Sequence, residues 1–507
     1  MSSRPIALLS LSDFSNVREN AQALTDAGWT IVASRETVDV LQEAQIPVTP
    51  IEDYLDFYQE LPFPPTLHPQ IEHALTMDAD KRIDMVYVVP YQTDIGLDVG
   101  GRTLLALAAK GERLPVMTPA DFASVVAEIA AEGEVSENTR SRLIRLVYTE
   151  LAQFYGALSG DGDVPMHLSA PREIMHGENP YQESAALYQV TDWNDPLGIA
   201  KFAWHSETLP CFTNLADMDA LINTMVLANL ASAECLGATP NVAIGAKHGN
   251  PVGMAFDDND PGAAIERALF GSARSVWGGE FIVNFPVDAQ LAERLLSSQD
   301  RHDRLGNGNW MLDVVCAPSF TDEARAIIGK RRARKVMENP SLANPALAAH
   351  PWQYRHVRGG FLRQPIHDYV LDFQACERMG GELDRHTTID LLIAWSVAWT
   401  SNHGGNEVAL TKDGVLLACA GGPSTVEATQ TTLTRARANG HDVTGAAFAA
   451  NAFFPFTDGP ELLCAAGVTR GLVPAGGRNE DLVRKYFSDH GVFMVYLPGE
   501  YRGFSRH

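Results

Sequence analysis

Short apolar runs alternate with stretches that place apolar residues at helical spacing through the first third of the chain. The run that begins at Ile6 is typical of a buried strand. Val17, Ala21 and Leu24 then recur at the spacing of one helix face before Gly28. Because strand and helix patterns keep alternating, a parallel α/β sheet is expected. Further strands are expected over residues 30–33, 47–51 and 84–89.

Two helical patterns and a polar stretch mark the end of this region. A capped helix start is predicted at Thr118, because Pro119 follows it and Asp121 stands three residues after it. A second helical pattern runs from about 137 to 158, and the glycine-rich Ser159–Asp163 follows it. We therefore expect a first domain over residues 1–158, a linker over 159–166 and a second domain over 167–507.

The pattern after the linker is α/β and more mixed. Asp413-Gly414 between two apolar runs predicts a β-hairpin turn. No internal repeat is evident in the sequence. Helices are expected over residues 217–230, 262–270, 389–399, 426–439 and 480–490, and strands over 241–246, 281–285, 407–411, 415–419 and 493–497.

Composition excludes several classes of function. A formal net charge of −24 over 507 residues argues against binding to nucleic acid or to an anionic membrane surface. Six cysteines without a CxxC pair predict reduced thiols and no zinc site. No apolar run is long enough to span a bilayer, and no signal-peptide pattern opens the chain, so a cytoplasmic enzyme is expected. The basic run 330–335 is expected to be a solvated face, with contact to an anionic ligand or to the acidic tail of a cofactor as the alternative.

Lys247 and His248 stand where an expected strand ends and Gly249 permits a sharp turn. Neighbouring side chains on a strand point to opposite faces, so both can reach one substrate only where the strand breaks. A histidine can move a proton near neutral pH, and a lysine can stabilise a developing anion. The dipeptide alone is equally consistent with a solvated lysine beside a structural histidine.

Other stretches of the second region combine glycines with polar or aromatic residues. Trp277 precedes two glycines, which would let a flat ligand approach the backbone. Gly421-Gly422 lies between an expected strand and helix, a place that suits an anion. Each stretch alone is better explained as a tight turn or as side chains that fill the hydrophobic core. Polar turn residues 177–182 and the aromatic cluster 452–458 complete the set.

Taken together and in this order, these stretches resemble the bifunctional AICAR transformylase/IMP cyclohydrolase family over nearly the whole chain. The family's SN-x(5)-KDG segment is similar to Gly405–Gly414, and its terminal R-x-F pair is similar to Arg502 and Phe504. Its elements GENPHQ, KHANPCG, SAFGG and SDAFFPFRDG resemble residues 177–182, 247–253, 275–279 and 450–459.

The resemblance implies a methylglyoxal-synthase-like first domain and a larger cytidine-deaminase-like α/β second domain of two subdomains. It implies transfer of the formyl group of 10-formyltetrahydrofolate to an amine, without a metal, by a homodimer with composite sites. His248 would handle the amine proton, Lys247 would stabilise the oxyanion or protonate the leaving nitrogen, and Asn406 would hydrogen-bond the formyl oxygen. The implied folate contacts are Trp277, Gly278, Gly279, Phe453, Pro455, Phe456 and Asp458, and the implied substrate contacts are His176, Gly177, Asn179, Gly421, Gly422, Arg502 and Phe504.

The first domain departs from the family at its phosphate loop. Residues of the cyclohydrolase half match at Ser10, Ser12, Tyr91, Asp98, Gly100, Gly101 and Lys110. The family's STGGT, however, is Ala33–Thr37 here, with Glu36 in place of a glycine where a phosphate would approach. The family's RVKTLHP is Phe63–Pro69, so its arginine and catalytic lysine are absent, and Phe14 replaces a usual lysine. Loss of ring closure is therefore expected.

The second domain lacks two arginines that the family uses to grip a nucleotide phosphate. Met175 and Thr425 occupy their positions, and Arg172 is a candidate replacement. Three hypotheses remain open. The chain is a formyltransferase for a different amine in specialised metabolism, a monofunctional AICAR transformylase, or an inactive folate-binding or scaffolding paralogue. The first is favoured because the phosphate contacts are depleted in both domains.

Overall fold

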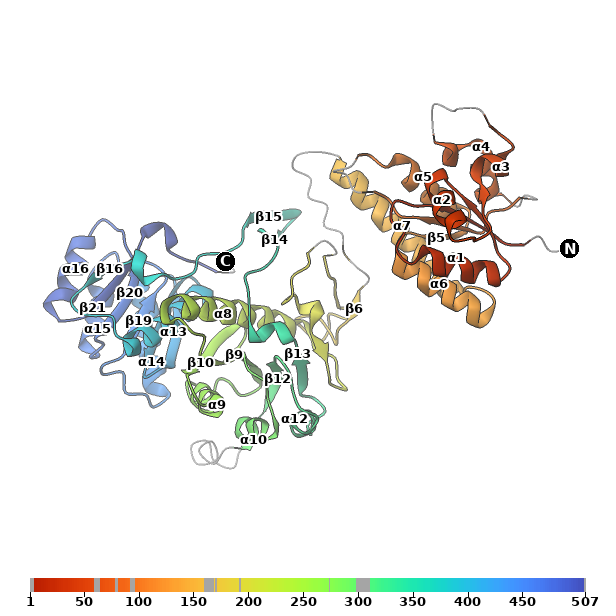
Figure 1. Cartoon of the computed structure of the whole chain (residues 1–507). Helices are drawn as coiled ribbons and strands as arrows, with labels where there is room; N and C mark the ends of the chain where they lie inside the picture. The colour runs from red at the N-terminus through yellow and green to blue at the C-terminus, as the bar shows by residue number, and fades with distance from the viewer. Residues whose placement is uncertain are drawn as a thin grey trace. The chain divides into compact units, whose positions relative to one another are not determined.

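The computed structural model describes residues 4–58, 64–77, 81–91, 96–158, 168, 171–190, 193–272, 274–297 and 311–505. The chain divides into two compact units, Met1–His167 and Leu168–His507, shown in Figure 1. The predicted linker over 159–166 lies outside the described residues. Each unit has its own sheet and core.

In the described part of the first unit, five strands form one parallel sheet in the order β3-β2-β1-β4-β5. The predicted parallel α/β sheet is therefore confirmed for this unit. The strands are β1 (Ile6–Ser10), β2 (Thr30–Ala33), β3 (Thr49–Pro50), β4 (Met85–Val88) and β5 (Leu114–Val116).

Helices cover both faces of this sheet because its strands are apolar on both sides. Ala7 and Leu9 of β1 face one core, while Leu8 between them faces the other. The predicted cap at Thr118 is present, since its Oγ1 accepts the Asp121 N–H at 3.0 Å. The helices are α1 (Val17–Asp26), α2 (Arg35–Glu43), α3 (Ile51–Leu55), α4 (Pro69–Thr76), α5 (Val99–Lys110), α6 (Pro119–Glu132) and α7 (Glu137–Leu158).

Over its described ranges, the second unit contains a twelve-stranded sheet in the order β16-β21-β20-β19-β17-β18-β10-β9-β11-β12-β13-β8. Its pairing is mixed, because antiparallel hairpins occupy the centre and parallel pairs flank them. The strands are β8 (Ala203–Trp204), β9 (Asn241–Lys247), β10 (Asn250–Asp257), β11 (Gly279–Val283), β12 (Leu312–Ala317), β13 (Lys335–Glu338), β16 (Glu377–Met379), β17 (Asn406–Lys412), β18 (Val415–Gly422), β19 (Ala447–Ala450), β20 (Arg470–Pro474) and β21 (Phe493–Leu497).

The two halves of this sheet repeat one arrangement on either side of the β10–β18 pair. Each half has a hairpin (β9–β10 or β17–β18), then an antiparallel neighbour (β11 or β19), two parallel strands, and an antiparallel edge strand. The structure therefore contains a repeat that is not evident in the sequence. Such a repeat can be invisible in sequence because strand order is set by burial pattern rather than by residue identity.

Helices form a layer on each face of the large sheet (Figure 1). Trp395 and Trp399 of α13 share one core with α8, and alternate strand residues such as Ala243 and Phe448 face the opposite cores. The helices are α8 (Phe212–Leu236), α9 (Pro261–Leu269), α10 (Ala289–Ser297), α12 (Asp322–Ile328), α13 (Arg385–Thr400), α14 (Thr425–Ala438), α15 (Asp458–Ala465) and α16 (Glu480–Asp489).

Two small ribbons of the second unit stand outside the large sheet: β6 (Arg172–Glu173) with β7 (Ala186–Leu187), and β14 (Trp352–Val357) with β15 (Gly360–Pro365). Phe361 and Leu362 on β15 are exposed.

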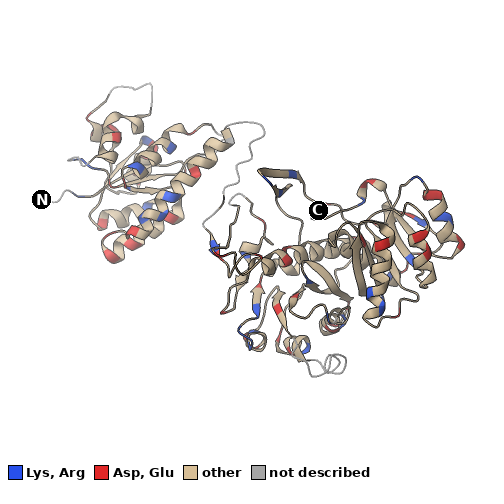
Figure 2. Ribbon diagram, turned by 180° about the vertical axis from the view of Figure 1, so that it is seen from behind, with Lys and Arg blue, Asp and Glu red and all other residues tan. Residues whose placement is uncertain are grey.

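The distribution of charged residues over the structure is consistent with the acidic composition of the chain. Acidic residues are spread over helices of both units (Figure 2). The basic run 330–335 is only partly a solvated face: Arg334 and Lys335 are buried, and the Arg334 guanidinium donates to two backbone carbonyls. No helix among the described residues is long and apolar enough to cross a membrane.

Candidate active site

The turn between β9 and β10 carries Lys247 and His248. His248 has φ 53° and Gly249 φ 67°, so two left-handed residues join the strands in a tight hairpin. His248 is exposed, while Lys247 is partly buried and its Nζ donates to the carbonyl oxygen of Gly278. The strand thus breaks at the dipeptide, as the sequence predicts.

Strand pairing brings the other candidate residues to the same edge of the sheet. Glu280 pairs with Ala246, which places the Trp277–Gly279 stretch beside the end of β9. Asn406 pairs with Gly422 at the end of β18, and β18 runs antiparallel to β10. Lys247, His248, Asn406, Gly421 and Gly422 therefore share one sheet edge.

Asn250 connects the Lys247–His248 turn to the loop before β17. Its Oδ1 accepts the backbone N–H of Asn402 at 2.7 Å, and its Nδ2 donates to the carbonyl oxygen of His248 at 3.0 Å. The side chain is 9% exposed. Asn250 stands inside the stretch that resembles the family, but no role for it was predicted from the sequence.

Asn406 uses its amide nitrogen within the protein. Its Nδ2 donates to the carbonyl oxygens of Gly422 and Pro423 at 3.3 and 3.1 Å, which holds the loop before α14. Donation from the same nitrogen to a formyl oxygen would require one of these contacts to be exchanged.

Close packing within the protein requires glycine at two positions in the glycine pairs. A Cβ on Gly279 would lie 2.1 Å from the carbonyl oxygen of Ala246, and one on Gly421 would lie 2.2 Å from Glu407 Oε1. Gly278 has φ 67° and lies against Lys247 Nζ. Gly422 faces the first turn of α14. Close approach of a ligand to these backbones stays a prediction.

The aromatic residues divide between surface and core. Trp277, Phe456 and Phe504 are each about half exposed, whereas Phe454 is buried. Phe453 packs over Gly477. Such exposed rings are suitable walls for a flat ligand.

The segment that follows the aromatic cluster begins α15. Pro455 and Asp458 are exposed, and the Asp458 carboxylate accepts the N–H of Gly459 at 2.9 Å. The C-terminal tail reaches the same sheet edge, because Gly503 N–H donates to the carbonyl oxygen of Asn451, whose Oδ1 accepts the Glu407 N–H. Arg502 is exposed and has no ion-pair partner among the residues that the structure describes.

The turn predicted from residues 177–182 lies at the start of α8. Gly177 N–H donates to the carbonyl oxygen of Gln182, and Asn179 N–H donates to Gln182 Oε1 at 2.8 Å. The carbonyl oxygen of His176 accepts the Phe212 N–H at the first residue of the helix.

Arg172, the candidate replacement for the absent arginines, makes its contacts within the protein. Its guanidinium carbon lies 3.1 Å from the centre of the Trp204 ring, and its Nη1 donates to the carbonyl oxygen of Phe202. Met175 is exposed and Thr425 is buried at the start of α14. Positions 175 and 425 thus carry no cation, whereas Arg502 keeps its charge.

A pair of buried carboxyl groups was missed by sequence reasoning. Glu280 on β11 and Asp217 on α8 are both buried, and Asn214 Nδ2 donates to Glu280 Oε1 at 3.0 Å. Burial, and then the Asp217 carboxyl, raise the pKa of Glu280. The raised pKa favours the protonated form of the Glu280 carboxyl. Only the three-dimensional pairing of β11 with α8 places them together.

His403, Glu407 and Cys419 have donor atoms within 4.8 Å of one another. His403 Nδ1 lies 2.7 Å from Glu407 Oε2, while Cys419 Sγ is 3.8 Å from the same oxygen. Nitrogen and oxygen ligands on one tetrahedral zinc ion would be separated by about 3.3 Å, so the shorter contact is a hydrogen bond. Burial raises the pKa of the Cys419 thiol.

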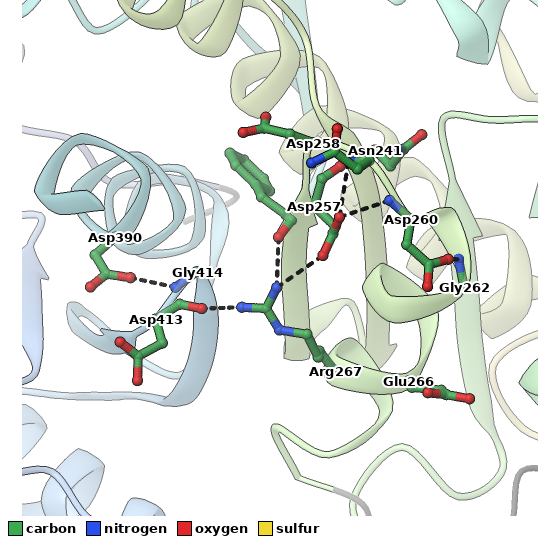
Figure 3. Close-up of polar contacts among 12 residues, drawn as sticks. Asn241, Asp257, Asp258, Asp260, Gly262, Glu266, Arg267, Asp390, Asp413 and Gly414 are labelled. Carbon is green, nitrogen blue, oxygen red and sulfur yellow. Dashed lines mark hydrogen bonds and ion pairs between the residues drawn. The ribbon is translucent and has the colours of Figure 1, made fainter. Parts of the chain in front are cut away.

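A pocket of about 250 Å³ lies at the opposite edge of the sheet, where β10 ends. There Arg267 donates to the carbonyl oxygens of Phe256 and Asp413 and to the Asp257 carboxylate (Figure 3). Asp390 Oδ1 accepts the Gly414 N–H at 2.7 Å (Figure 3). These contacts pin the β17–β18 turn, and the pocket contains none of the predicted site residues.

In the first unit, the first turn of α2 carries one charge of each sign, on Arg35 and Glu36. Ser34 precedes the helix and Glu36 is exposed in its first turn. Asp98 caps α5 through the Gly101 N–H at 2.7 Å, and Ser12 Oγ donates to the carbonyl oxygen of Val89. Ser10, Tyr91 and Gly100 are partly buried, and Lys110 is exposed. Phe63 lies outside the described residues.

Comparison with known proteins identifies the family of the chain. The family model described as AICARFT/IMPCHase bienzyme matches residues 110–435. The bifunctional purine biosynthesis protein PurH of Acidithiobacillus ferrooxidans is 29% identical and that of Neisseria meningitidis 28%; the alignments cover 97% and 96% of this chain and 97% of each relative. A solved structure titled "Crystal structure of ForH" has 23% identity and a TM-score of 0.28, covering 31% of this chain and 98% of its own. A likeness this low bears on neither fold nor function. The chain is a divergent member of the AICARFT/IMPCHase bienzyme family.

Proposed function

We propose that the second unit transfers the formyl group of 10-formyltetrahydrofolate to an amine other than AICAR. The observation that carries this proposal is the contrast at one sheet edge. Lys247, His248 and Asn406 converge there, while Met175 and Thr425 stand where the family has phosphate-binding arginines. Each lost arginine–phosphate contact costs roughly 1.5–3 kcal/mol of affinity.

The residues have distinct roles in the proposed reaction. The amine nitrogen attacks the formyl carbon and loses a proton to His248. Lys247 stabilises the oxyanion, and the bond from carbon to the folate nitrogen then breaks. The exposed rings of Trp277 and Phe456 and the partly buried ring of Phe453 would hold the flat folate, and Asp458 would bind its pterin amide edge.

We infer that the first unit has lost IMP cyclohydrolase activity. Glu36 lies in the first turn of α2, where its charge would repel a phosphate. The substrate of ring closure is formyl-AICAR, and its conversion to IMP by the purified protein would contradict this inference.

The proposed assembly is a homodimer. The β14–β15 ribbon pairs with no other strand among the described residues and exposes Phe361 and Leu362. Tyr354 of β14 stacks on Trp193, whereas the apolar side chains on β15 are exposed, so a second copy is expected to cover them. Light scattering after size-exclusion chromatography would show twice the 55.2 kDa chain mass, and a monomer would contradict the proposal.

The transfer reaction is tested by tetrahydrofolate release. The protein is incubated with 10-formyltetrahydrofolate and either AICAR or a panel of unphosphorylated amines. We expect turnover with an unphosphorylated amine. Rapid turnover of AICAR alone would favour the second hypothesis, a monofunctional AICAR transformylase. The absence of turnover with every amine would favour the third, an inactive paralogue.

A further inference from the structure

His403 is held at the candidate site by a buried carboxylate. Its Nδ1 lies 2.7 Å from Glu407 Oε2, and its backbone N–H donates to Glu407 Oε1 at 2.5 Å. The Glu407 side chain is fully buried, and that of His403 is 13% exposed. The Nε2 of His403 makes no hydrogen bond with any residue that the structure describes. One ring nitrogen is fixed and the other is available.

The local fold is built around this pair. Glu407 points to the face of β17 that packs on α8 and α13, as Ala409 two residues later does. The residue opposite it is Gly421, where a Cβ would lie 2.2 Å from Glu407 Oε1. After His403, Gly404 and Gly405 adopt φ values of 119° and 139°, which side chains rarely allow.

His403 lies next to the catalytic turn. Its neighbour Asn402 is bonded through its backbone N–H to Asn250, which in turn bonds the backbone of His248. Asn406, three residues further along, closes the other side of the loop at Gly422. The His403 loop is therefore held between the two predicted catalytic segments.

We propose that His403, oriented by Glu407, is a second proton-transfer residue of this site, a role that rests on the proposed function. Formyl transfer requires two proton movements, because the amine loses a proton and the leaving folate nitrogen gains one. His248 takes the first. As the carbon–nitrogen bond to folate breaks, its electron pair takes the proton from Nε2 of the His403 imidazolium, and both rings are reset by water.

The carboxylate explains why this histidine suits the role. A buried carboxylate on one nitrogen fixes the tautomer and the orientation of the ring, so that the other nitrogen faces away from the carboxylate. The surrounding charged and titratable groups are Glu407 and Cys419 on the sheet, Arg435 of α14 bonded to the Cys419 carbonyl, and Lys247 and His248 across Asn250. Lys247 is then left to stabilise the oxyanion.

The test compares His403→Gln, His403→Ala and Glu407→Gln with a matched control. His386 on α13 pairs with Asp413 at 2.9 Å at the far edge of the sheet, so His386→Gln removes a similar pair away from the site. We expect the three site variants to lose about 10²-fold in kcat with KM changed by less than about threefold, and added imidazole to restore part of the His403→Ala rate. The control should keep the wild-type rate.

A readout independent of turnover is the tautomer of His403, followed by nitrogen NMR of histidine-labelled protein and assigned by its loss in His403→Gln. A proton on Nδ1 in the wild type, changed in Glu407→Gln, supports the pair. A neutral ring with its proton on Nε2 and none on Nδ1, or a stoichiometric metal ion found by elemental analysis, overturns it. An active wild type with an equally active His403→Ala overturns only the role of His403, whereas a wild type without turnover overturns the proposed function.

Discussion

Asn250 and Asn402 are 152 positions apart in sequence and are joined by a hydrogen bond of 2.7 Å from the Asn402 backbone to the Asn250 side chain. The bond fixes the loop before β17 against the turn that carries Lys247 and His248. Because both segments leave strands of one sheet, their relative position is set by strand pairing and by this single side chain.

Replacing Asn250 with alanine should separate the two segments. The change removes bonds from a buried amide, so we expect a loss of about 1–3 kcal/mol in the free energy of unfolding. We also expect a fall in kcat of about tenfold or more, because the catalytic segments lose their alignment. Denaturant unfolding and steady-state kinetics measure both effects.

Asn259→Ala is the matched control, since Asn259 is exposed at the far end of β10. An Asn250→Ala protein with the kinetics and stability of this control would show that the bridge does not position the site.

Glu280→Gln should change how stability depends on pH. The folded-state pKa of Glu280 is raised by burial and by Asp217, so its contribution to stability is present below the unfolded pKa and is lost as pH rises through the folded pKa. Glutamine keeps an oxygen that can accept the hydrogen bond from Asn214, and its side chain does not ionise. We therefore expect the Tm of the variant minus that of the wild type to grow from pH 5 to pH 8.

Glu323→Gln provides the comparison, because Glu323 is exposed in the first turn of α12. A constant Tm difference across this pH range for Glu280→Gln, as for Glu323→Gln, would mean that the buried acid pair does not hold an extra proton.

Met175→Arg should raise the affinity of the protein for a phosphorylated acceptor. Met175 is exposed beside the turn at 177–182, so an arginine can extend from it without burial. One charge-assisted contact is worth roughly 1.5 kcal/mol or more, which corresponds to about a tenfold gain in affinity for a phosphorylated amine. Isothermal titration with AICAR measures it.

Met175→Gln separates charge from side-chain length. Equal affinities of the arginine and glutamine variants for AICAR would indicate that position 175 does not face the acceptor phosphate.

Local patterns in the sequence predict much of the fold. Val17, Ala21 and Leu24 are the buried residues of α1, and Phe493–Leu497 is β21 as expected. Such elements bury one repeated set of apolar positions, so spacing reveals them. The strand β10 was not predicted because Asn250, Pro251 and Gly253 interrupt its apolar run. The structure extends α8 beyond the predicted 217–230 to Phe212–Leu236, since this helix is buried on more than one face and lacks a clear polar stripe.

The candidate site was predictable only through short motifs. Lys247 and His248 were singled out from the turn that follows a strand and given a role by the resemblance, which alone pointed to Asn406. The structure places all three at one sheet edge. Glu280, Asp217, His403 and Glu407 were missed, because their significance lies in contacts between strands and helices that are distant in sequence. Gly421 was assigned to substrate, and the structure shows that it also makes room for Glu407.

The most direct test of the central claim compares AICAR with the same nucleoside lacking its phosphate as formyl acceptors. The two share one amine and differ only in the group that the absent arginines would hold. We expect kcat/KM for the nucleoside to equal or exceed that for AICAR. A preference for AICAR of about 10²-fold or more, the value of two arginine–phosphate contacts, would contradict the claim that the acceptor has changed.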